Sequence, residues 1–281
     1  MSIITLTTDF GTKDHFVGAV KGAIYSMISD AKIVDISHEI SPFNITETAY
    51  ILKNAYKNFP EGTIHIVGVD SELNEDNKHI ALLLNGHYFV CPDNGLISMI
   101  TSEIIPTKIV EINIHDRLES NFSVLDVFVQ VAAHLARGGT LEVIGKPLEN
   151  YKKIFEMQPK VSRDLSIISG NIIYIDNYGN VISNISEKLF KEIGKGREFK
   201  LNASRYSFNK INYKYCDIVD FNQDSKFRQN EGNKLAIFNS AGFIEIAIYK
   251  SNLTTVGGAS SLLGLSYRDS ITIEFHKEGI N

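Results

Sequence analysis

The stretch IITLTTDFG, residues 3–11, is a short apolar run that closes on an acid, an aromatic residue and a glycine. A run of this kind is typical of a buried β-strand that ends at Asp9 to Gly11. Residues 15–28 and 45–59 carry apolar side chains at helical spacing, and residues 32–36 and 64–69 are again short apolar runs. Strands and amphipathic helices therefore alternate, which predicts an α/β domain with a mostly parallel sheet.

The second half of the chain has a different pattern. After Pro159, short strand-like runs dominate at residues 171–175, 234–238, 243–249 and 270–275. Closely spaced short strands are typical of an all-β domain. We therefore predict an N-terminal α/β domain over residues 1–158 and a smaller, mostly β domain over residues 166–281.

Composition narrows the class of protein. The 281 residues have a net charge of −5, and positive and negative residues are interspersed along the chain. Because no basic stripe stands out, nucleic acid and anionic membrane surfaces are disfavoured as partners. No apolar run approaches the roughly 20 residues that span a bilayer, and the first residues do not resemble a signal peptide. Cys91 and Cys216 form no CxxC pair, and no cluster has metal-ligand spacing. We expect a cytoplasmic protein without a metal site.

Polar residues gather where the apolar runs end. Asp9 follows the first run, Asp70 follows residues 64–69, and the stretch DNYGN, residues 176–180, follows residues 171–175. An acid, an aromatic ring and a glycine at a strand end suit a polar small molecule. The alternative is a plain turn or helix cap, because aspartate, asparagine and glycine favour both. The pattern indicates one ligand held by two halves of a chain.

Six short motifs occur in an order that resembles the S-adenosylmethionine hydroxide adenosyltransferases, a family similar in fold to the fluorinases and chlorinases. They are residues 7–11 (TTDFG), 34–40 (VDISHEI), 59–63 (FPEGT), 92–96 (PDNGL), 176–180 (DNYGN) and 239–242 (NSAG). The resemblance implies a barrel-like C-terminal β domain and a homotrimer, with the ligand between the N-terminal domain of one subunit and the C-terminal domain of the next. It also implies that S-adenosylmethionine and water give adenosine and methionine, without a cofactor.

The resemblance assigns the nucleoside end of the substrate to residues of both halves. Asp9 would bond the ribose hydroxyls, since a carboxylate accepts two adjacent hydroxyl protons. Phe43 aligns with an aromatic residue beside the ribose or adenine, and it fits an ordinary core position equally well. Asn180 would contact the nucleoside, and Ala259, after an apparent insertion at residues 251–256, matches a backbone segment at the adenine edge.

The same resemblance assigns the methionine end to the C-terminal half. Asp176 and Ser240 would receive the amino group, because an ammonium needs acceptors and these side chains provide them. Tyr178 lies in the same stretch as Asp176 and is counted among the substrate-binding residues.

The catalytic set departs from the family pattern. Asp70 aligns with the aspartate that positions or deprotonates the attacking water, although it also fits a strand-end turn. The arginine of the family falls on Asn77, with Lys78 next to it, and the histidine falls on Ser123. A serine is not a base near neutral pH, and an ammonium does not reproduce a planar guanidinium. Asp70 is therefore the main catalytic candidate, with Asn77, Lys78 and Ser123 beside it.

Three histidines near these motifs have alternative interpretations. His79 is either a substitute base or, in the preferred interpretation, a solvent-exposed side chain. His38 is expected to orient a loop, and His134, in an apolar helix, to be a satisfied core histidine.

Three functions stay open at this point. The first is an S-adenosylmethionine hydrolase that gives adenosine and L-methionine by water attack at the ribose C5′, where the replaced positions leave room for slow chemistry. A halide nucleophile is disfavoured, because the charge of Asp70 would repel it. The second is a non-catalytic protein that binds S-adenosylmethionine or adenosine. The third is a structural trimer whose pocket accepts another small metabolite.

Overall fold

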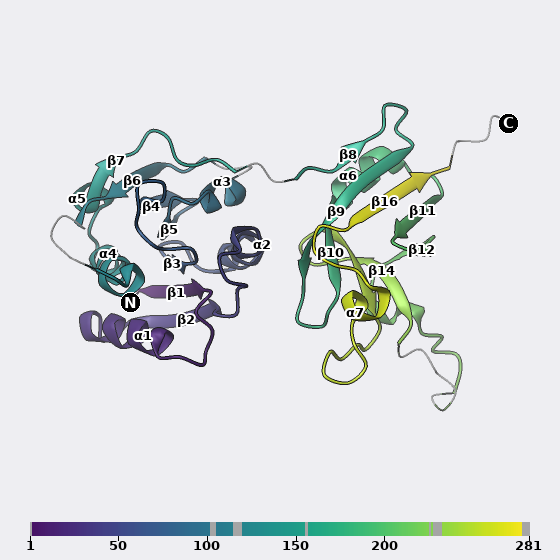
Figure 1. The fold of residues 1–281 in the computed structure, drawn as a ribbon, viewed down its shortest axis with the longest axis horizontal. Coiled ribbons are helices and arrows are strands. Elements are labelled where there is room, and N and C mark those ends of the chain that lie inside the picture. The colour runs from purple at the N-terminus through teal and green to yellow at the C-terminus, as the bar shows by residue number, and fades with distance from the viewer. Residues whose placement is uncertain are drawn as a thin grey trace. The chain divides into compact units, whose positions relative to one another are not determined.

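The computed structural model describes residues 2–101, 105–114, 120–154, 157–224, 226 and 232–276. The chain divides into two compact units, residues 1–156, called unit 1, and residues 157–281, called unit 2. Unit 1 combines a sheet with several helices, whereas unit 2 consists mainly of strands (Figure 1).

Unit 1 is built on a seven-stranded sheet in the order β2-β1-β3-β5-β4-β6-β7. β2, β1, β3 and β5 pair in parallel, while the β5–β4, β4–β6 and β6–β7 pairs are antiparallel. The predicted α/β architecture with a mostly parallel sheet is therefore confirmed. The strands are β1 (Ile3–Thr8), β2 (Lys32–Ser37), β3 (Ile64–Gly68), β4 (His79–Leu84), β5 (His87–Pro92), β6 (Lys108–Ile112) and β7 (Gly145–Pro147).

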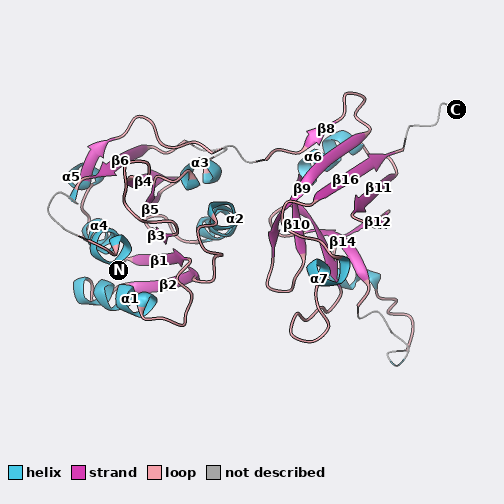
Figure 2. Ribbon diagram, viewed as in Figure 1, coloured by secondary structure: helices cyan, strands magenta, loops and turns pink. Residues whose placement is uncertain are grey.

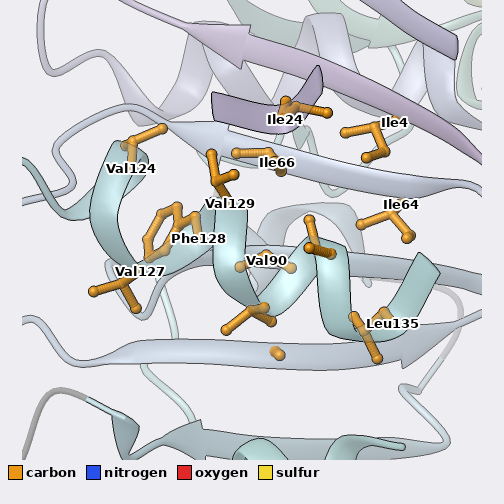
Figure 3. Packing of buried hydrophobic residues seen from close by; sticks show 14 of the residues in the cluster. Ile4, Ile24, Ile64, Ile66, Val90, Val124, Val127, Phe128, Val129 and Leu135 are labelled. Carbon is orange, nitrogen blue, oxygen red and sulfur yellow. The ribbon is translucent and has the colours of Figure 1, made fainter. Parts of the chain in front are cut away.

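Helices pack on unit 1 in two groups, each with its own hydrophobic cluster. α1 (Phe16–Met27) and α4 (Val129–Ala136) share one cluster with β1 and β3, in which Ile4, Ile24 and Phe128 are fully buried (Figure 3). α2 (Ile45–Ala55) and α3 (Leu96–Ile100) share the other. Alternate side chains of a strand point to opposite faces of its sheet, which explains why one sheet feeds both clusters.

The described part of unit 1 also contains three shorter helical segments. The predicted helix over residues 45–59 is α-helical only to Ala55 and continues as a 3₁₀ turn, η1 (Tyr56–Asn58). A π-helical turn, η3 (Val124–Phe128), leads directly into α4, and α5 (Leu141–Ile144) precedes β7. A π-helical turn is rare and is frequently found at functional sites.

Unit 2 is a near-closed, barrel-like sheet in the order β12-β11-β16-β9-β10-β15-β14-β13, with β8 paired to β9 (Figure 2). All pairs are antiparallel except β13 with β14. The prediction of a mostly β second half is confirmed. The strands are β8 (Lys160–Val161), β9 (Ile167–Ile175), β10 (Val181–Ser186), β11 (Phe199–Ala203), β12 (Tyr206–Phe208), β13 (Ile211–Asn212), β14 (Lys234–Phe238), β15 (Phe243–Ile248) and β16 (Ser270–Phe275).

Among the described residues, two α-helices and one 3₁₀ turn lie between these strands. They are α6 (Glu187–Gly194), η4 (Tyr215–Ile218) and α7 (Ala259–Leu263). Isoleucines of β9, β10, β15 and β16 form the buried cluster of the unit. In the described ranges, no helix is both long and apolar enough to cross a membrane.

Candidate functional site

Two candidate acids lie at the same edge of the unit 1 sheet. β1 and β3 are neighbouring parallel strands in which Thr8 pairs with Gly68. Asp9 follows Thr8 directly, and Asp70 comes two residues after Gly68. The edge at the carboxyl ends of parallel strands is where α/β folds bind ligands. Asp9 and Asp70, which the sequence placed at the ends of separate apolar runs, therefore lie at the same edge of this sheet.

Asp9 is tied to the turn that carries Phe43. Its Oδ2 accepts a hydrogen bond of 2.9 Å from the backbone N–H of Phe43. Phe43 has a φ of 61°, in the left-handed region, and its side chain is 71% exposed. The ring is therefore not part of the hydrophobic clusters of unit 1, and a strained, exposed aromatic residue is more often found at binding sites than elsewhere.

A polar network holds the loop that begins at Asp9. Nδ1 of the buried His38 lies 2.7 Å from Thr8 Oγ1, and its Nε2 lies 3.1 Å from Asp35 Oδ1. Lys21 Nζ pairs with the other oxygen of Asp35 at 2.5 Å. Partial burial opposes ionisation of Asp35, but the hydrogen bonds from Lys21 and His38 outweigh it and lower its pKa. The backbone N–H of Gly11 donates to His38 O at 2.8 Å, so His38 orients this loop as expected.

Asp70 sits in a strained turn with its carboxylate unused. Its φ is 47°, which is uncommon for a residue with a side chain. Asn77 Nδ2 donates to Asp70 O at 2.7 Å and to Glu72 O at 3.0 Å, which fixes the turn through the backbone. Among the described residues, no hydrogen bond or ion pair reaches the Asp70 carboxylate. Asn77 is 6% exposed, and its side-chain N–H groups donate to these two backbone carbonyl groups.

His79 corrects the expectation of an exposed side chain. It is fully buried in β4, with Nε2 2.9 Å from Ser71 O and its ring 4.7 Å from that of Phe128. A carbonyl only accepts hydrogen bonds, so Nε2 carries the proton and donates. That nitrogen is therefore not a base for the reaction. Lys78, by contrast, is exposed.

Ser123 begins the π-helical turn η3, which packs on the end of β3. A Cβ atom on Gly68 would lie 2.8 Å from Val124 Cγ2, so glycine is needed for this close approach. The Ser123 hydroxyl makes no capping hydrogen bond. The tertiary fold thus brings Ser123 to the same edge as Asp70, although 52 positions separate them in the sequence.

In unit 2, the stretch 176–180 closes on itself. The Asp176 carboxylate accepts hydrogen bonds from the backbone N–H groups of Tyr178 and Asn180 at 2.8 and 2.9 Å. Its second oxygen accepts from Asn180 Nδ2 at 3.0 Å. Tyr178 is 63% exposed and projects from this turn. Asp176 therefore builds the turn, and its carboxylate oxygens still have lone pairs for a ligand.

Asn180 carries an unsatisfied acceptor. The residue is 4% exposed, and its Oδ1 is buried with no partner in the part of the chain that the structure describes. A buried carbonyl oxygen without a hydrogen bond costs about 1–3 kcal/mol, so such groups are usually satisfied by a ligand or water. Asn180 Oδ1 therefore marks a place for a hydrogen-bond donor.

The start of α7 packs directly on this turn. Ser260 N donates to Gly179 O at 2.8 Å, and a Cβ on Gly258 would lie 2.4 Å from Tyr178 O. Ala259 is fully buried beside it. The structure thus brings Ala259 next to the Asp176–Asn180 turn, and its place at the adenine edge stays a prediction.

Ser240 lies on an exposed turn between β14 and β15. Asn239 Oδ1 accepts from the N–H groups of Ala241 and Phe243 at 3.0 and 3.1 Å, which closes that turn. Next to it lies a residue that the sequence analysis missed, Glu245 on β15, which is 3% exposed. Its signal was a lone acid inside the apolar run FIEIAI, residues 243–248.

One further hollow, of about 420 Å³, lies at the C-terminal end of α4 and is lined by His134 and Arg137 among others. Ser2 Oγ donates a hydrogen bond to Ala136 O beside this hollow. The hollow therefore lies near the start of β1, whereas Asp9 follows the end of that strand. His134 is partly exposed, with Nε2 near Thr140 O at 3.1 Å, and is not the core histidine that we expected. Among the described residues, no group of three or more His, Cys, Asp or Glu side chains is placed to hold a metal ion.

Comparison with known proteins agrees with this arrangement. Residues 4–145 match the SAM hydroxide adenosyltransferase N-terminal domain, and residues 170–272 match the corresponding C-terminal domain. The chain is 33% identical to a (R)-S-adenosyl-L-methionine hydrolase of Methanocaldococcus jannaschii, over 97% of this chain and 96% of that protein. A fluorinase of Actinopolyspora mzabensis is 25% identical over 69% of this chain and 75% of the fluorinase. A crystal structure of an uncharacterised conserved protein from Thermotoga maritima superimposes with a TM-score of 0.81 at 30% identity, over 96% of this chain and 99% of that one.

Proposed function

The chain belongs to the SAM hydroxide adenosyltransferase family, and we propose that it is a hydrolase that converts S-adenosylmethionine and water into adenosine and L-methionine. The observation that carries this proposal is the similarity, over nearly the whole of both chains, to the hydrolase of Methanocaldococcus jannaschii. The unused carboxylate of Asp70 at the ligand-binding edge of unit 1 supports water as the nucleophile.

The reaction is a displacement at the ribose C5′. The water oxygen forms a bond to C5′ while the C5′–S bond breaks. The electron pair of the C5′–S bond stays on the sulfur of methionine, and the water releases one proton. Asp70 is the group that we propose to orient this water, because a carboxylate accepts its hydrogen bonds and can take up the proton. The positive φ of Asp70 supports this role, since strained residues cluster at active sites.

The residues around Asp70 would activate the water more weakly than the arginine and histidine that are usual in the family. Ser123 would donate or accept one hydrogen bond to the water, and Lys78 would supply a positive charge. Asn77 would act only through the backbone of the turn, because its Nδ2 is bonded to two carbonyl oxygens. None of them supplies an imidazole or a guanidinium, so we expect slow turnover.

Unit 1 would hold the ribose. Asp9 uses Oδ2 to fix the Phe43 turn, and its other oxygen would accept from a ribose hydroxyl. The exposed ring of Phe43 suits stacking against the sugar or the base.

Unit 2 would hold the two ends of the ligand. The buried Oδ1 of Asn180 would accept a hydrogen bond from the nucleoside, with the backbone at Ala259 and the ring of Tyr178 beside it. Asp176 and Ser240 would accept from the amino group of the methionine part.

We further propose a homotrimer in which unit 1 of one subunit and unit 2 of the next enclose the ligand, acting in the cytoplasm without a cofactor. The support is indirect: unit 1 offers groups for the ribose and the water, whereas unit 2 offers groups for the base and the amino acid. Cys91 and Cys216 are free thiols, which suits a reducing compartment.

The direct test is to incubate the purified protein with S-adenosylmethionine and to measure adenosine and methionine by chromatography, before and after dialysis against a chelator. We expect both products in equal amounts, unchanged by the chelator, and little product from the Asp70→Ala variant. If the Asp70→Ala variant forms adenosine as fast as the wild type, the catalytic role of Asp70 is rejected. Tight binding of S-adenosylmethionine without any product would favour the non-catalytic alternative.

The shared site is tested by mixing two impaired variants and measuring the rate at a substrate concentration well below KM, where both Asp70→Ala and Asn180→Ala lower it. Asp70→Ala subunits keep an intact unit 2, and Asn180→Ala subunits keep an intact unit 1. If a site uses the two units of different subunits, random reassembly restores activity at about a quarter of the sites. A mixture whose rate is no higher than the average of its two components would contradict the proposed assembly.

A further inference from the structure

Glu245 is a buried acid that the proposed mechanism does not use. It lies in β15, where the alternate residues Ile244 and Ile246 belong to the hydrophobic cluster of unit 2. Glu245 points to the other face of the sheet, in register with Ile182 of β10 and Ile237 of β14. It is nevertheless only 3% exposed. A buried carboxyl needs partners, because burial of an isolated charge is costly.

The partners of Glu245 connect it to the Ser240 turn. Tyr215 of η4 donates its hydroxyl to Glu245 Oε1 at 2.6 Å. The side chain of Asn239 donates a second hydrogen bond to the same carboxyl. Since Asn239 Oδ1 closes the turn by accepting from Ala241 and Phe243, the amide of Asn239 joins Glu245 to the turn that carries Ser240.

The surroundings of Glu245 act on its pKa in both directions. Burial raises the pKa of Glu245, the hydrogen bond from Tyr215 lowers it, the nearby charge of Asp176 raises it, and the bond from Asn239 lowers it. Among the described residues, no lysine, arginine or histidine forms an ion pair with either Glu245 or Asp176. In the part of the chain that the structure describes, Glu245 and Asp176 therefore repel each other without an ion pair that would relieve the repulsion.

Asn180 gives an independent indication that a donor is missing here. Its Nδ2 donates to Asp176, while its buried Oδ1 has no partner in the described ranges. A ligand that brings hydrogen-bond donors and a positive charge would satisfy both features.

We propose that Glu245 is a specificity-determining residue, which together with Asp176 selects ligands that carry an ammonium group and, through Asn239, positions Ser240 to receive it. This inference rests on the proposed function, because it concerns the end of the substrate that holds the amino acid. Nucleosides without that group gain nothing from Glu245. The residue acts on recognition and does not touch the reacting C5′ atom.

The test compares two uncleaved ligands by calorimetry. S-adenosylhomocysteine carries the amino-acid head, and 5′-methylthioadenosine is a similar nucleoside thioether without it. For Glu245→Gln we expect about tenfold weaker binding of the first and less than twofold change for the second, because a charge-assisted hydrogen bond is lost. Glu245→Asp, which keeps the charge, should recover part of the difference. The matched control is Glu274→Gln, an exposed acid that also accepts from an asparagine, Asn202, at 3.0 Å.

Equal weakening of both ligands in Glu245→Gln, or no weakening of either, would overturn the inference. If that variant fails to fold, Tyr215→Phe replaces it: loss of the phenol donor raises the pKa of Glu245, so S-adenosylhomocysteine should again bind selectively more weakly, and an unchanged ratio would overturn the inference. Because binding is measured, the inference survives a chain that binds but does not hydrolyse. A wild-type chain that binds neither ligand would overturn the proposed function, and the inference with it.

Discussion

The turns after β3 in unit 1 and β9 in unit 2 both carry an aspartate, but they use it in opposite ways. The carboxylate of Asp176 accepts hydrogen bonds from the backbone N–H groups of its own turn. Asp70 leaves its carboxylate unused, and its turn is held instead by Asn77 through backbone carbonyl groups. The difference suggests a division of labour: unit 1 keeps an acid free for chemistry, and unit 2 builds a rigid frame around an unpaired acceptor, Asn180 Oδ1.

The largest expected effect concerns the residue that holds the Asp70 turn. Asn77→Asp replaces a buried donor by a carboxylate that faces two carbonyl oxygens, which should cost about 3 kcal/mol or more in the free energy of unfolding. Urea denaturation measures this loss. The control is Asn74→Asp in the same loop, where the exposed side chain already acts as an acceptor, for Asp76 N at 2.9 Å. Equal stability of the two variants would show that Asn77 is not the group that holds the turn.

The next effect is on turnover. Asp70→Asn keeps the shape of the side chain and removes the charge, so we expect kcat to fall about 100-fold with KM changed less than about threefold, as for a lost general base. Initial rates of adenosine release give both constants. A fall in kcat/KM that comes from KM alone would remove the distinction between a chemical unit 1 and a binding unit 2.

Acidification should act on the two units with opposite signs. Burial, and then the neighbouring His87, lowers the pKa of His65 to about 3, so below the ordinary value of 6.5 the unfolded state binds more protons than the folded one. Stability of unit 1 is then lost as the pH falls from 6.5 toward 3, by about 2 kcal/mol at pH 5. The raised pKa of Glu245 has the opposite effect: unit 2 gains stability as the pH falls from the folded-state pKa of Glu245 toward the ordinary value of 4.5.

Hydrogen exchange of β3 and β15 amides at pH 7 and pH 5 reads the two units separately. Protection of β3 should fall, and protection of β15 should hold or rise. His65→Gln should remove most of the loss in β3, whereas the surface change His134→Gln should not. Parallel losses in both strands would show that the units respond to acid as one body.

The smallest expected effect is on binding in unit 2. Asn180→Ala removes the buried acceptor and also the donor to Asp176, so KM for S-adenosylmethionine should rise about tenfold with kcat within about threefold. Rates measured over a range of substrate concentrations test this. The comparison variant is Asn171→Ala, whose partly buried amide donates to Arg268 O at 3.0 Å and lies outside the candidate site. A kcat defect in Asn180→Ala would place Asn180 in the chemistry instead.

Much of unit 1 was readable from periodicity. The runs at residues 3–8, 32–36 and 64–69 are strands because isoleucine, valine and leucine dominate them, and Asn85-Gly86 forms a tight turn with positive φ at both residues. His79 was misjudged because the residues before it, Asn77 and Lys78, are polar, whereas it packs against Phe128, nearly fifty positions away. Glu245 was missed because its partner, Tyr215, comes from another part of the chain.

The amino-acid sequence by itself determined where strands and helices lie and which chemical groups stand at their ends, because apolar spacing and turn residues act over short distances. Only the tertiary structure decided which of those groups are already occupied. In the described ranges, the carboxylate of Asp70 accepts no hydrogen bond, that of Asp176 accepts three within its own turn, and the amide oxygen of Asn180 is buried without a partner. Hydrogen-bond partners and burial depend on segments distant in the chain, which local patterns do not specify.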